Sequence, residues 1–170
     1  MRKKILLGLI GALIIIQFIQ PEKNVSGENS KDITNKYPMS AELSSLMAVA
    51  CNDCHTNKTV YPWYANIQPV AWWLSGHVND GKRKLNFSTF LSRPIAYQNH
   101  KLEEIIEMVK EKEMPLPSYT NFGLHKEANL TDEQRQLITA WAQTQMDTLK
   151  AQYPPDSLVM KRPSGPPPGQ

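Results

Sequence analysis

The two cysteines of the chain lie three positions apart and are followed directly by a histidine, in the sequence CNDCH from Cys51 to His55. On a helical turn, side chains at positions i, i+3 and i+4 project from the same side. Two thiols and an imidazole arranged in this way can form thioethers with the vinyl groups of a haem and supply one nitrogen ligand to its iron. The motif therefore predicts one covalently bound haem c, held by Cys51, Cys54 and His55.

Two other chemistries use closely spaced cysteines. A thioredoxin-like dithiol places its CxxC at the start of a helix after a strand, whereas this motif follows a helical pattern. A structural zinc site needs four ligands, and only Cys51, Cys54 and His55 are clustered in the sequence. Haem attachment fits the pattern better than either alternative.

A second axial ligand is needed if the iron is to be six-coordinate. Met114 is the first candidate, because it stands in a proline-stiffened loop before the last helix and a thioether ligand suits an electron-transfer haem. A methionine there could also simply fill the core. His77 is the second candidate, and His125 and His100 stay open, whereas the position of Met108 inside a helix favours core packing.

Aromatic and basic residues near the motif offer further contacts to a haem. The aromatic residues that could line its pocket, or pack in the general core, are Tyr61, Trp63, Tyr64, Trp72, Trp73 and Tyr119. A buried indole or phenol group needs a hydrogen-bond partner, which a haem propionate could provide. The basic residues that could pair with propionates, or remain solvated at the surface, are Lys82, Arg83 and Arg93.

Helices are the elements that must position these residues. Ser40 can cap a helix whose apolar residues follow the i, i+3, i+4, i+7 spacing and which leads directly into the motif. Further helices are expected over about 70–77 and 101–112, the second ending at the prolines of 114–117. A capping box at 131–134 begins the last one. No segment alternates like a strand, so the sequence predicts an all-α, small cytochrome-c-like domain with long loops around one haem.

The N-terminus adds an apolar segment that predicts a hydrophobic helix. Basic residues at positions 2–4 precede the mostly apolar stretch 5–19, which is the pattern of an export signal. No small-x-small cleavage site follows, which favours an uncleaved signal anchor that forms a transmembrane helix over a removed signal peptide. As a helix the stretch 5–19 measures roughly 22 Å, which is shorter than the hydrocarbon core of a membrane. A transmembrane span would therefore need further residues or a locally thinned bilayer. In both interpretations the remainder lies on the periplasmic side of a bacterial inner membrane, either anchored there or soluble after cleavage.

Composition divides the chain into four parts. Residues 1–22 form the signal anchor or signal peptide, 23–38 a polar linker, 39–150 the haem-binding domain and 151–170 a proline-rich disordered tail. The formal net charge of +3 comes entirely from the basic residues at positions 2–4. The exported part is therefore near neutral and has no basic stripe, so nucleic acid is not expected as a partner.

Five stretches of the chain resemble the bacterial haem-binding domain family, whose members carry one CxxCH motif and often an N-terminal hydrophobic segment. They are CNDCHTNKTVYPWY (51–64), QPVAWW (68–73), LNFS (85–88), MPLPSY (114–119) and LTDEQRQLITAWA (130–142). More distantly, the chain is similar to class I cytochromes c, from which it departs by the long aromatic segment after the motif. The resemblance implies a cytochrome-c-like fold, with His55 as the proximal and Met114 as the distal iron ligand.

The function expected from these features is the transfer of single electrons between unidentified redox proteins, in the periplasm or at the membrane. An enzyme is not expected, because the sequence has no second metal cluster, nucleophile elbow or phosphate loop. Two alternatives stay open: a haem enzyme of peroxidase type, which needs an open sixth position, and a haem-based sensor or binding module. The sixth ligand of the iron separates them.

Overall fold

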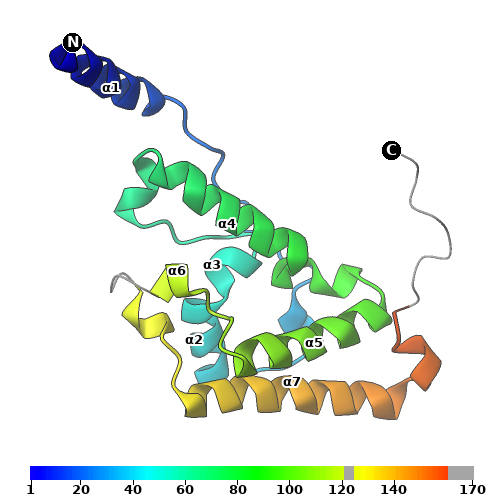
Figure 1. Cartoon of the computed structure of the whole chain (residues 1–170). Coiled ribbons are helices and arrows are strands. Elements are labelled where there is room, and N and C mark those ends of the chain that lie inside the picture. The colour runs from blue at the N-terminus through cyan, green and yellow to red at the C-terminus, as the bar shows by residue number, and fades with distance from the viewer. Residues whose placement is uncertain (121–124, 161–170) are drawn as a thin grey trace.

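Residues 1–120 and 125–160 are described by the computed structural model of the chain, shown in Figure 1. Every regular element within these ranges is helical, which confirms the predicted all-α fold. The α-helices are α1 (Arg2–Ile16), α2 (Ala41–Ala50), α3 (Asn52–His55), α4 (Val70–Lys84), α5 (Ile95–Lys110), α6 (Pro117–Thr120) and α7 (Asp132–Gln152). The 3-10 turns are η1 (Ile33–Asn35), η2 (Trp63–Asn66), η3 (Phe87–Ser92), η5 (Lys126–Ala128) and η6 (Pro155–Ser157).

Two long helices, α5 and α7, lie side by side at the base of the domain, and we call them the scaffold pair (Figure 1). The start of α7 is the predicted capping box: Thr131 Oγ1 accepts from the Gln134 N–H, and Gln134 Oε1 accepts from the Thr131 N–H. Side chains at helical spacing fill the interface, and Leu102 and Ile138 are fully buried there. Each such side chain contributes about 1.5–3 kcal/mol by removing apolar surface from water.

The helix α2 carries the CNDCH motif onto this base. Its N-terminus is capped as predicted, because Ser40 Oγ accepts from the Leu43 N–H at 3.1 Å. On α7, the indole N–H of Trp141 donates to the carbonyl of Pro38 at 2.9 Å and so fixes the chain just before α2. The apolar stripe that faces the core consists of Leu43, Leu46, Met47 and Ala50.

The helix α4 is longer than the sequence predicts, extending over Val70–Lys84 instead of ending near 77. Gly81 suggests a break in the sequence, but here it lies where α4 crosses the motif. A Cβ at this position would meet the carbonyl oxygen of Cys54 at 2.6 Å. Glycine thus permits the close crossing of two helices, and this packing outweighs its low helix propensity. The helix α5 also begins earlier than predicted, directly after Pro94.

The segment 23–38, predicted as a linker, packs against the domain. Ile33 and Tyr37 belong to the buried core, and the Tyr37 hydroxyl donates to Gln98 Oε1 at 2.6 Å. Of the predicted tail 151–170, Leu158 is buried, and its carbonyl accepts from the amide of Asn99 at 3.3 Å. Residues 161–170 lie outside the described part of the chain.

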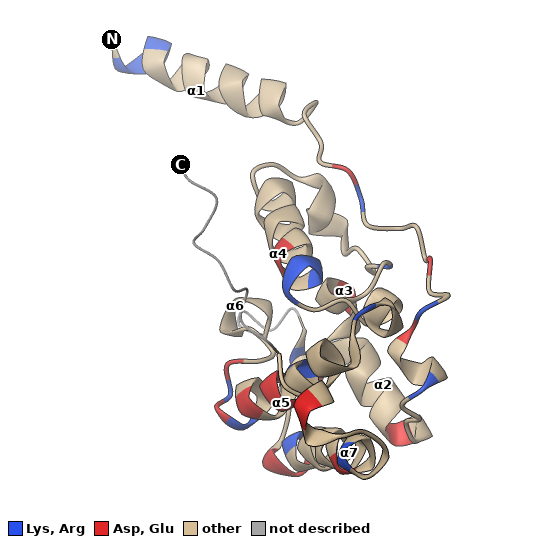
Figure 2. Cartoon of the chain, turned by 90° about the vertical axis from the view of Figure 1, so that its right-hand side faces the viewer, with Lys and Arg blue, Asp and Glu red and all other residues tan. Residues whose placement is uncertain are grey.

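The helix α1 points away from the rest of the domain (Figures 1 and 2). It covers 15 residues, and none of its side chains is buried. Among the residues that the structure describes, no helix is both long and apolar enough to cross a membrane, so the transmembrane helix expected from the sequence is not found.

Candidate functional site

The CNDCH motif occupies the bend between α2 and α3. The bend lies at Cys51, whose backbone (φ −129°, ψ −42°) interrupts the two helices. Cys51 and Cys54 are free thiols. Burial raises the pKa of Cys51 to about 12 and that of Cys54 to about 11, with smaller contributions from the neighbouring Cys54 and Asp53 charges respectively. Both thiols are therefore protonated at neutral pH.

The imidazole of His55 is held in one orientation by a backbone carbonyl. Its Nδ1 lies 2.9 Å from the carbonyl oxygen of Leu85, at the end of α4, and must donate the hydrogen bond. In a neutral imidazole this leaves the lone pair on Nε2. Burial lowers the pKa of His55, against the opposing effect of the Leu85 and Gly81 carbonyls. A neutral ring with one nitrogen fixed by a carbonyl is the usual arrangement of a metal-binding histidine.

A cavity of about 210 Å³ lies against the motif and is lined by Cys51, Cys54 and His55. The same cavity is lined by the two leading candidates for the second axial ligand, Met114 and His77. Far apart in the sequence, these residues meet here because α4 crosses α3 and the segment after α5 returns to the motif. The structure thus brings all four predicted site residues to one cavity.

The backbone of Met114 is fixed on both sides. Its N–H donates to the carbonyl of Met108 at 3.1 Å, and its own carbonyl accepts from Arg135 Nη1 at 2.7 Å. Arg135 Nη1 also donates to the carbonyl of Val109 at 2.9 Å, so that one guanidinium of α7 ties the end of α5 to the methionine loop. The position of Met114 at the cavity wall is therefore set by the scaffold pair.

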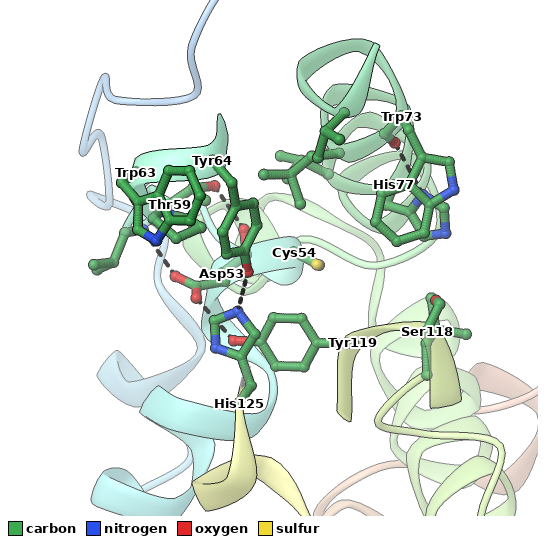
Figure 3. Close-up of a pocket in the computed structure, with 16 residues that line it drawn as sticks. Asp53, Cys54, Thr59, Trp63, Tyr64, Trp73, His77, Ser118, Tyr119 and His125 are labelled. Atoms are coloured by element: carbon green, nitrogen blue, oxygen red, sulfur yellow. Dashed lines mark hydrogen bonds between the residues drawn. The ribbon is translucent and has the colours of Figure 1, made fainter. Parts of the chain in front are cut away.

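A second cavity of about 420 Å³ adjoins the first (Figure 3). Its walls are largely apolar and include Trp63 and Tyr64 of η2 and Trp73 of α4. The two cavities share Cys54 and His77 as well as Asp53, Leu116 and Tyr119, so they lie side by side, and we call them together the cleft. An apolar cleft of this size, next to two protonated thiols and an imidazole with a lone pair on Nε2, fits a haem.

One wall of the larger cavity carries a group of polar side chains that includes Asp53, which is not singled out from the sequence. The Tyr119 hydroxyl donates to Asp53 Oδ2 at 3.0 Å, and Asp53 Oδ1 accepts from the Val60 N–H at 2.8 Å. Tyr64 and His125 are joined at 2.9 Å between the hydroxyl and Nε2. The rings of Tyr119 and His125 stack at 4.1 Å with an angle of 11° (Figure 3). His125 thus has its Nε2 engaged by a tyrosine, which disfavours it as an iron ligand.

The remaining histidines occupy different environments. His100 lies on α5, where Nε2 is 3.0 Å from Glu104 Oε1. His77 Nδ1 bonds to the carbonyl of Trp73 at 3.0 Å, which leaves Nε2 with a lone pair, as in His55. Among the histidines that the sequence leaves open, only His77 combines this geometry with a place in the cavity of His55.

The other residues singled out in the sequence are divided between the cleft and the surface. Trp63, Tyr64, Trp73 and Tyr119 line the larger cavity, as predicted for a haem pocket. The three basic residues predicted to pair with propionates have other contacts. Lys82 Nζ donates to Asn24 Oδ1 at 2.6 Å, and Arg83 forms an ion pair with Asp80 at 2.9 Å. Arg93 lies over the ring of Tyr97, 4.6 Å from its centroid. Lys84, not singled out in the sequence, is a basic residue that lines the smaller cavity. The phenol of Tyr61 accepts from the Asn24 N–H at 2.8 Å, and Trp72 is largely exposed on α4.

The comparison with protein families agrees with this site. The family model of the haem-binding domain matches residues 11–144, which include every residue of the cleft. The chain belongs to the haem-binding domain family. Haem is accordingly the cofactor that this membership supports. No curated protein and no solved structure matches the chain.

Within this haem-binding domain, the sequence could not reveal the groups that orient the motif. The Leu85 carbonyl and Asp53 are ordinary residues in the sequence, and only the crossing of α4 over α3 brings Leu85 to His55. Asp53 lies inside CNDCH, yet its bonds to Tyr119 and Val60 depend on the loop that follows. The one available signal was the high proportion of aromatic residues between 61 and 73, after the motif.

Proposed function

We propose that this haem-binding domain is a monohaem c-type cytochrome that transfers single electrons outside the cytoplasm. The observation that carries the proposal is the cavity lined jointly by Cys51, Cys54, His55 and Met114. When bound, the haem supplies a reversible one-electron couple at its iron. The residues of the chain hold it, orient it and keep it in an apolar surrounding.

Cys51 and Cys54 would hold the haem through two thioether bonds. Each bond would form by addition of the S–H group across a vinyl group, which consumes no oxidant or reductant. His55 would supply Nε2 to the iron, and its hydrogen bond to the Leu85 carbonyl holds the ring in one orientation.

We propose Met114 as the opposite axial ligand. The support is its place in the cavity of His55 and the fixing of its backbone by Met108 and Arg135, which limits where the thioether can lie. His77 is the alternative, since its Nε2 carries a lone pair in the same cavity. Both choices give a six-coordinate iron, which suits electron transfer because neither face is open to small molecules.

Spectroscopy of the exported holoprotein tests this assignment. In Met114→Ala we expect loss of the low-spin ferric spectrum and of the thioether-to-iron charge-transfer band, whereas His77→Ala should keep both. Met108→Ala, a methionine of α5, is the matched control. A low-spin spectrum that survives Met114→Ala and disappears in His77→Ala would assign the ligand to His77 instead.

The proposed role as a carrier has a separate test. A potentiometric titration should follow a single one-electron step, and the reduced protein should bind carbon monoxide slowly and incompletely. The second candidate is a haem enzyme of peroxidase type, favoured by the Tyr64–His125 pair on the wall of the larger cavity. Rapid carbon monoxide binding by most of the sample, with turnover of peroxide, would support the enzyme and contradict the carrier.

The proposed location is the periplasmic side of the inner membrane, held there by α1. Support comes from the basic residues at positions 2–4 before an apolar helix and from a haem motif whose attachment chemistry suits an exported protein. Fractionation of cells should find the protein with the membranes and accessible to protease added to spheroplasts. Recovery of the mature protein, lacking α1, in the soluble periplasm would favour cleavage.

A further inference from the structure

We propose that the exposed apolar side chains between residues 60 and 73 form a second membrane contact, which holds the haem cleft against the lipid surface. We call this set the aromatic face; its members are Val60, Trp63, Ile67, Val70, Trp72 and Trp73. The inference rests on the proposed membrane location and adds to it the orientation of the domain. Four of its members also line the larger cavity, whereas Ile67 and Trp72 lie outside both cavities, so the haem site gives these two no role.

The aromatic face is exposed and uncharged. Trp63 is 74% and Trp73 48% exposed, in contrast to Trp141, which is buried in the core. Residues 59–79 contain no lysine, arginine, aspartate or glutamate. Exposed apolar clusters of this kind mark binding surfaces, and tryptophan is enriched where proteins meet the boundary between lipid and water.

The position of α1 identifies lipid as the occupant. After its three basic residues, α1 is apolar on all sides, and none of its residues is buried by the rest of the chain. A helix that is apolar all round belongs in a protein core or in lipid. Figure 2 shows its basic residues at the far end, whereas the end nearer the domain carries no charge.

Hydrogen bonds fasten the end of α1 to the middle of the aromatic face. Gln17 and Gln68 are joined twice, Gln17 Nε2 donating to the Gln68 carbonyl at 3.3 Å and the Gln68 N–H donating to Gln17 Oε1 at 2.9 Å. The Gln68 amide also donates to the carbonyl of Ile19 at 2.7 Å. Beside it, Gln20 Nε2 donates to the Asn66 carbonyl at 3.2 Å and Lys23 Nζ to Asn66 Oδ1 at 2.6 Å.

Gln68 is the centre of this junction. Its side chain is 3% exposed, although it is polar and lies between exposed apolar neighbours. A buried amide is costly unless its hydrogen bonds are made, and here one is made across the junction to the Ile19 carbonyl and one to the nearby Trp72 N–H. Contact of α1 with lipid, as proposed, would therefore bring Ile67, Val70 and Trp72 to the membrane surface as well.

The haem cleft lies on the same side of the domain as the aromatic face. Val60, Trp63, Val70 and Trp73 line the larger cavity and are also members of the aromatic face. Contact of the face with lipid thus places the mouth of the cleft, and with it the edge near Cys54, close to the plane of the membrane. The scaffold pair, with its charged outer surface, lies on the far side (Figure 2).

Lipid crosslinking of the full-length holoprotein tests the inference. The protein is reconstituted in vesicles of phosphatidylcholine and phosphatidylglycerol that contain a phospholipid with a photoreactive diazirine near the headgroup, and the adducts are mapped by mass spectrometry. We expect adducts on α1 and on residues 60–73, and none on α7. The haem absorption spectrum, recorded on the same sample, verifies that the site is intact.

Variants of exposed residues outside the cleft sharpen the test. Ile67→Ser combined with Trp72→Ser should reduce adducts on residues 60–73 several-fold and leave those on α1 unchanged. Val159→Ser, an exposed apolar residue elsewhere, is the matched control. Gln68→Ala should reduce the same adducts by releasing the junction, and it should also broaden the orientation of the haem in electron paramagnetic resonance of oriented membranes.

The outcomes separate this inference from the proposed function. Adducts on α1 alone, with normal haem spectra, would overturn the second contact and leave the anchored cytochrome standing. A protein that does not associate with vesicles would contradict the membrane location itself. Crosslinks between copies of the chain through residues 60–73 would assign the aromatic face to a protein interface and overturn the inference.

Discussion

The scaffold pair and the aromatic segment around α4 use the same kinds of side chain in opposite ways. In α5 and α7, apolar residues face inward and charged residues face outward, as in any amphipathic helix. In η2 and α4, tryptophans and aliphatic residues line a cleft and remain exposed to solvent. The scaffold is complete within the chain, whereas the aromatic segment has apolar surface that only a ligand or a partner surface can cover.

From this difference we expect the scaffold pair to provide most of the stability and the aromatic segment around α4 to provide the binding function. Residues fully buried between α5, α7 and α2 supply most of the hydrophobic stabilisation. The side chains that line the cleft contribute less to stability, because on one side they face a cavity and make fewer contacts with other side chains. Substitutions in the two regions are therefore expected to differ in kind, and four experiments test the comparison, from the largest expected effect to the smallest.

Removal of both thiols should abolish covalent attachment without loss of the scaffold. In the double variant Cys51→Ala and Cys54→Ala, we expect that haem is extracted by acid acetone and is absent from the protein band after denaturing electrophoresis. Circular dichroism should show that the helical content is retained. Haem that stays attached in the double variant would contradict the assignment of the motif.

Two tryptophans give a matched comparison of the regions. Trp141→Ala should lower the free energy of unfolding by about 3–5 kcal/mol, because it leaves a cavity in the scaffold and removes the donor to the Pro38 carbonyl. Trp72→Ala, with a side chain 40% exposed, should cost about 1 kcal/mol or less. Urea denaturation of the two variants measures both values, and equal losses would contradict the division into two regions.

Alanine substitutions at two glycines of α4 should change the stability of the protein in opposite directions. Gly81→Ala brings a Cβ within 2.6 Å of the backbone oxygen of Cys54, so we expect destabilisation of about 1–3 kcal/mol and a disturbed haem spectrum. Gly76 has no atom within 4 Å of the corresponding position. Gly76→Ala should therefore stabilise the helix by about 0.5–1 kcal/mol. Thermal unfolding together with absorption spectra distinguishes the two, and a harmless Gly81→Ala would refute the close crossing.

The smallest effect is expected at the capping box of α7. Thr131→Ala removes the acceptor of the Gln134 N–H and should cost about 1 kcal/mol, with no change in the haem spectrum. Thr144→Ala, at an exposed position in the middle of the same helix, should change stability by only a few tenths of a kcal/mol. Denaturant midpoints measure both, and a spectral change in Thr131→Ala would show that the scaffold and the cleft are coupled.

Much of the scaffold could be predicted because its signals are local. Ser40 and the Thr131–Gln134 box mark helix starts through hydrogen bonds that span three residues, so the sequence contains both partners. The length of α4 could not be predicted in the same way. Gly81 favours a break by its propensity, and only contact with Cys54 makes it suitable for a continuing helix.

The segment before α2 shows the same limit. Its polar composition predicts a free linker, yet Asn24 bonds to the carbonyl of Thr56 and to Lys82, and Ile33 enters the core. A few well-placed side chains among polar neighbours are enough to fix a segment when the domain offers matching groups. Composition averages over these positions and therefore does not reveal them.

By itself, the sequence predicted a haem-attachment motif, because the spacing of Cys51, Cys54 and His55 fits one helical turn whatever the rest of the chain does. It also determined the helical class and the best-capped helices. Only the tertiary structure decided which groups surround the motif, namely the Leu85 carbonyl bonded to His55, and Met114 and His77 at one cavity. It also decided the hydrogen-bonded junction at Gln68. These depend on contacts between residues far apart in the chain, whose geometry arises from packing and leaves no regular spacing in the sequence.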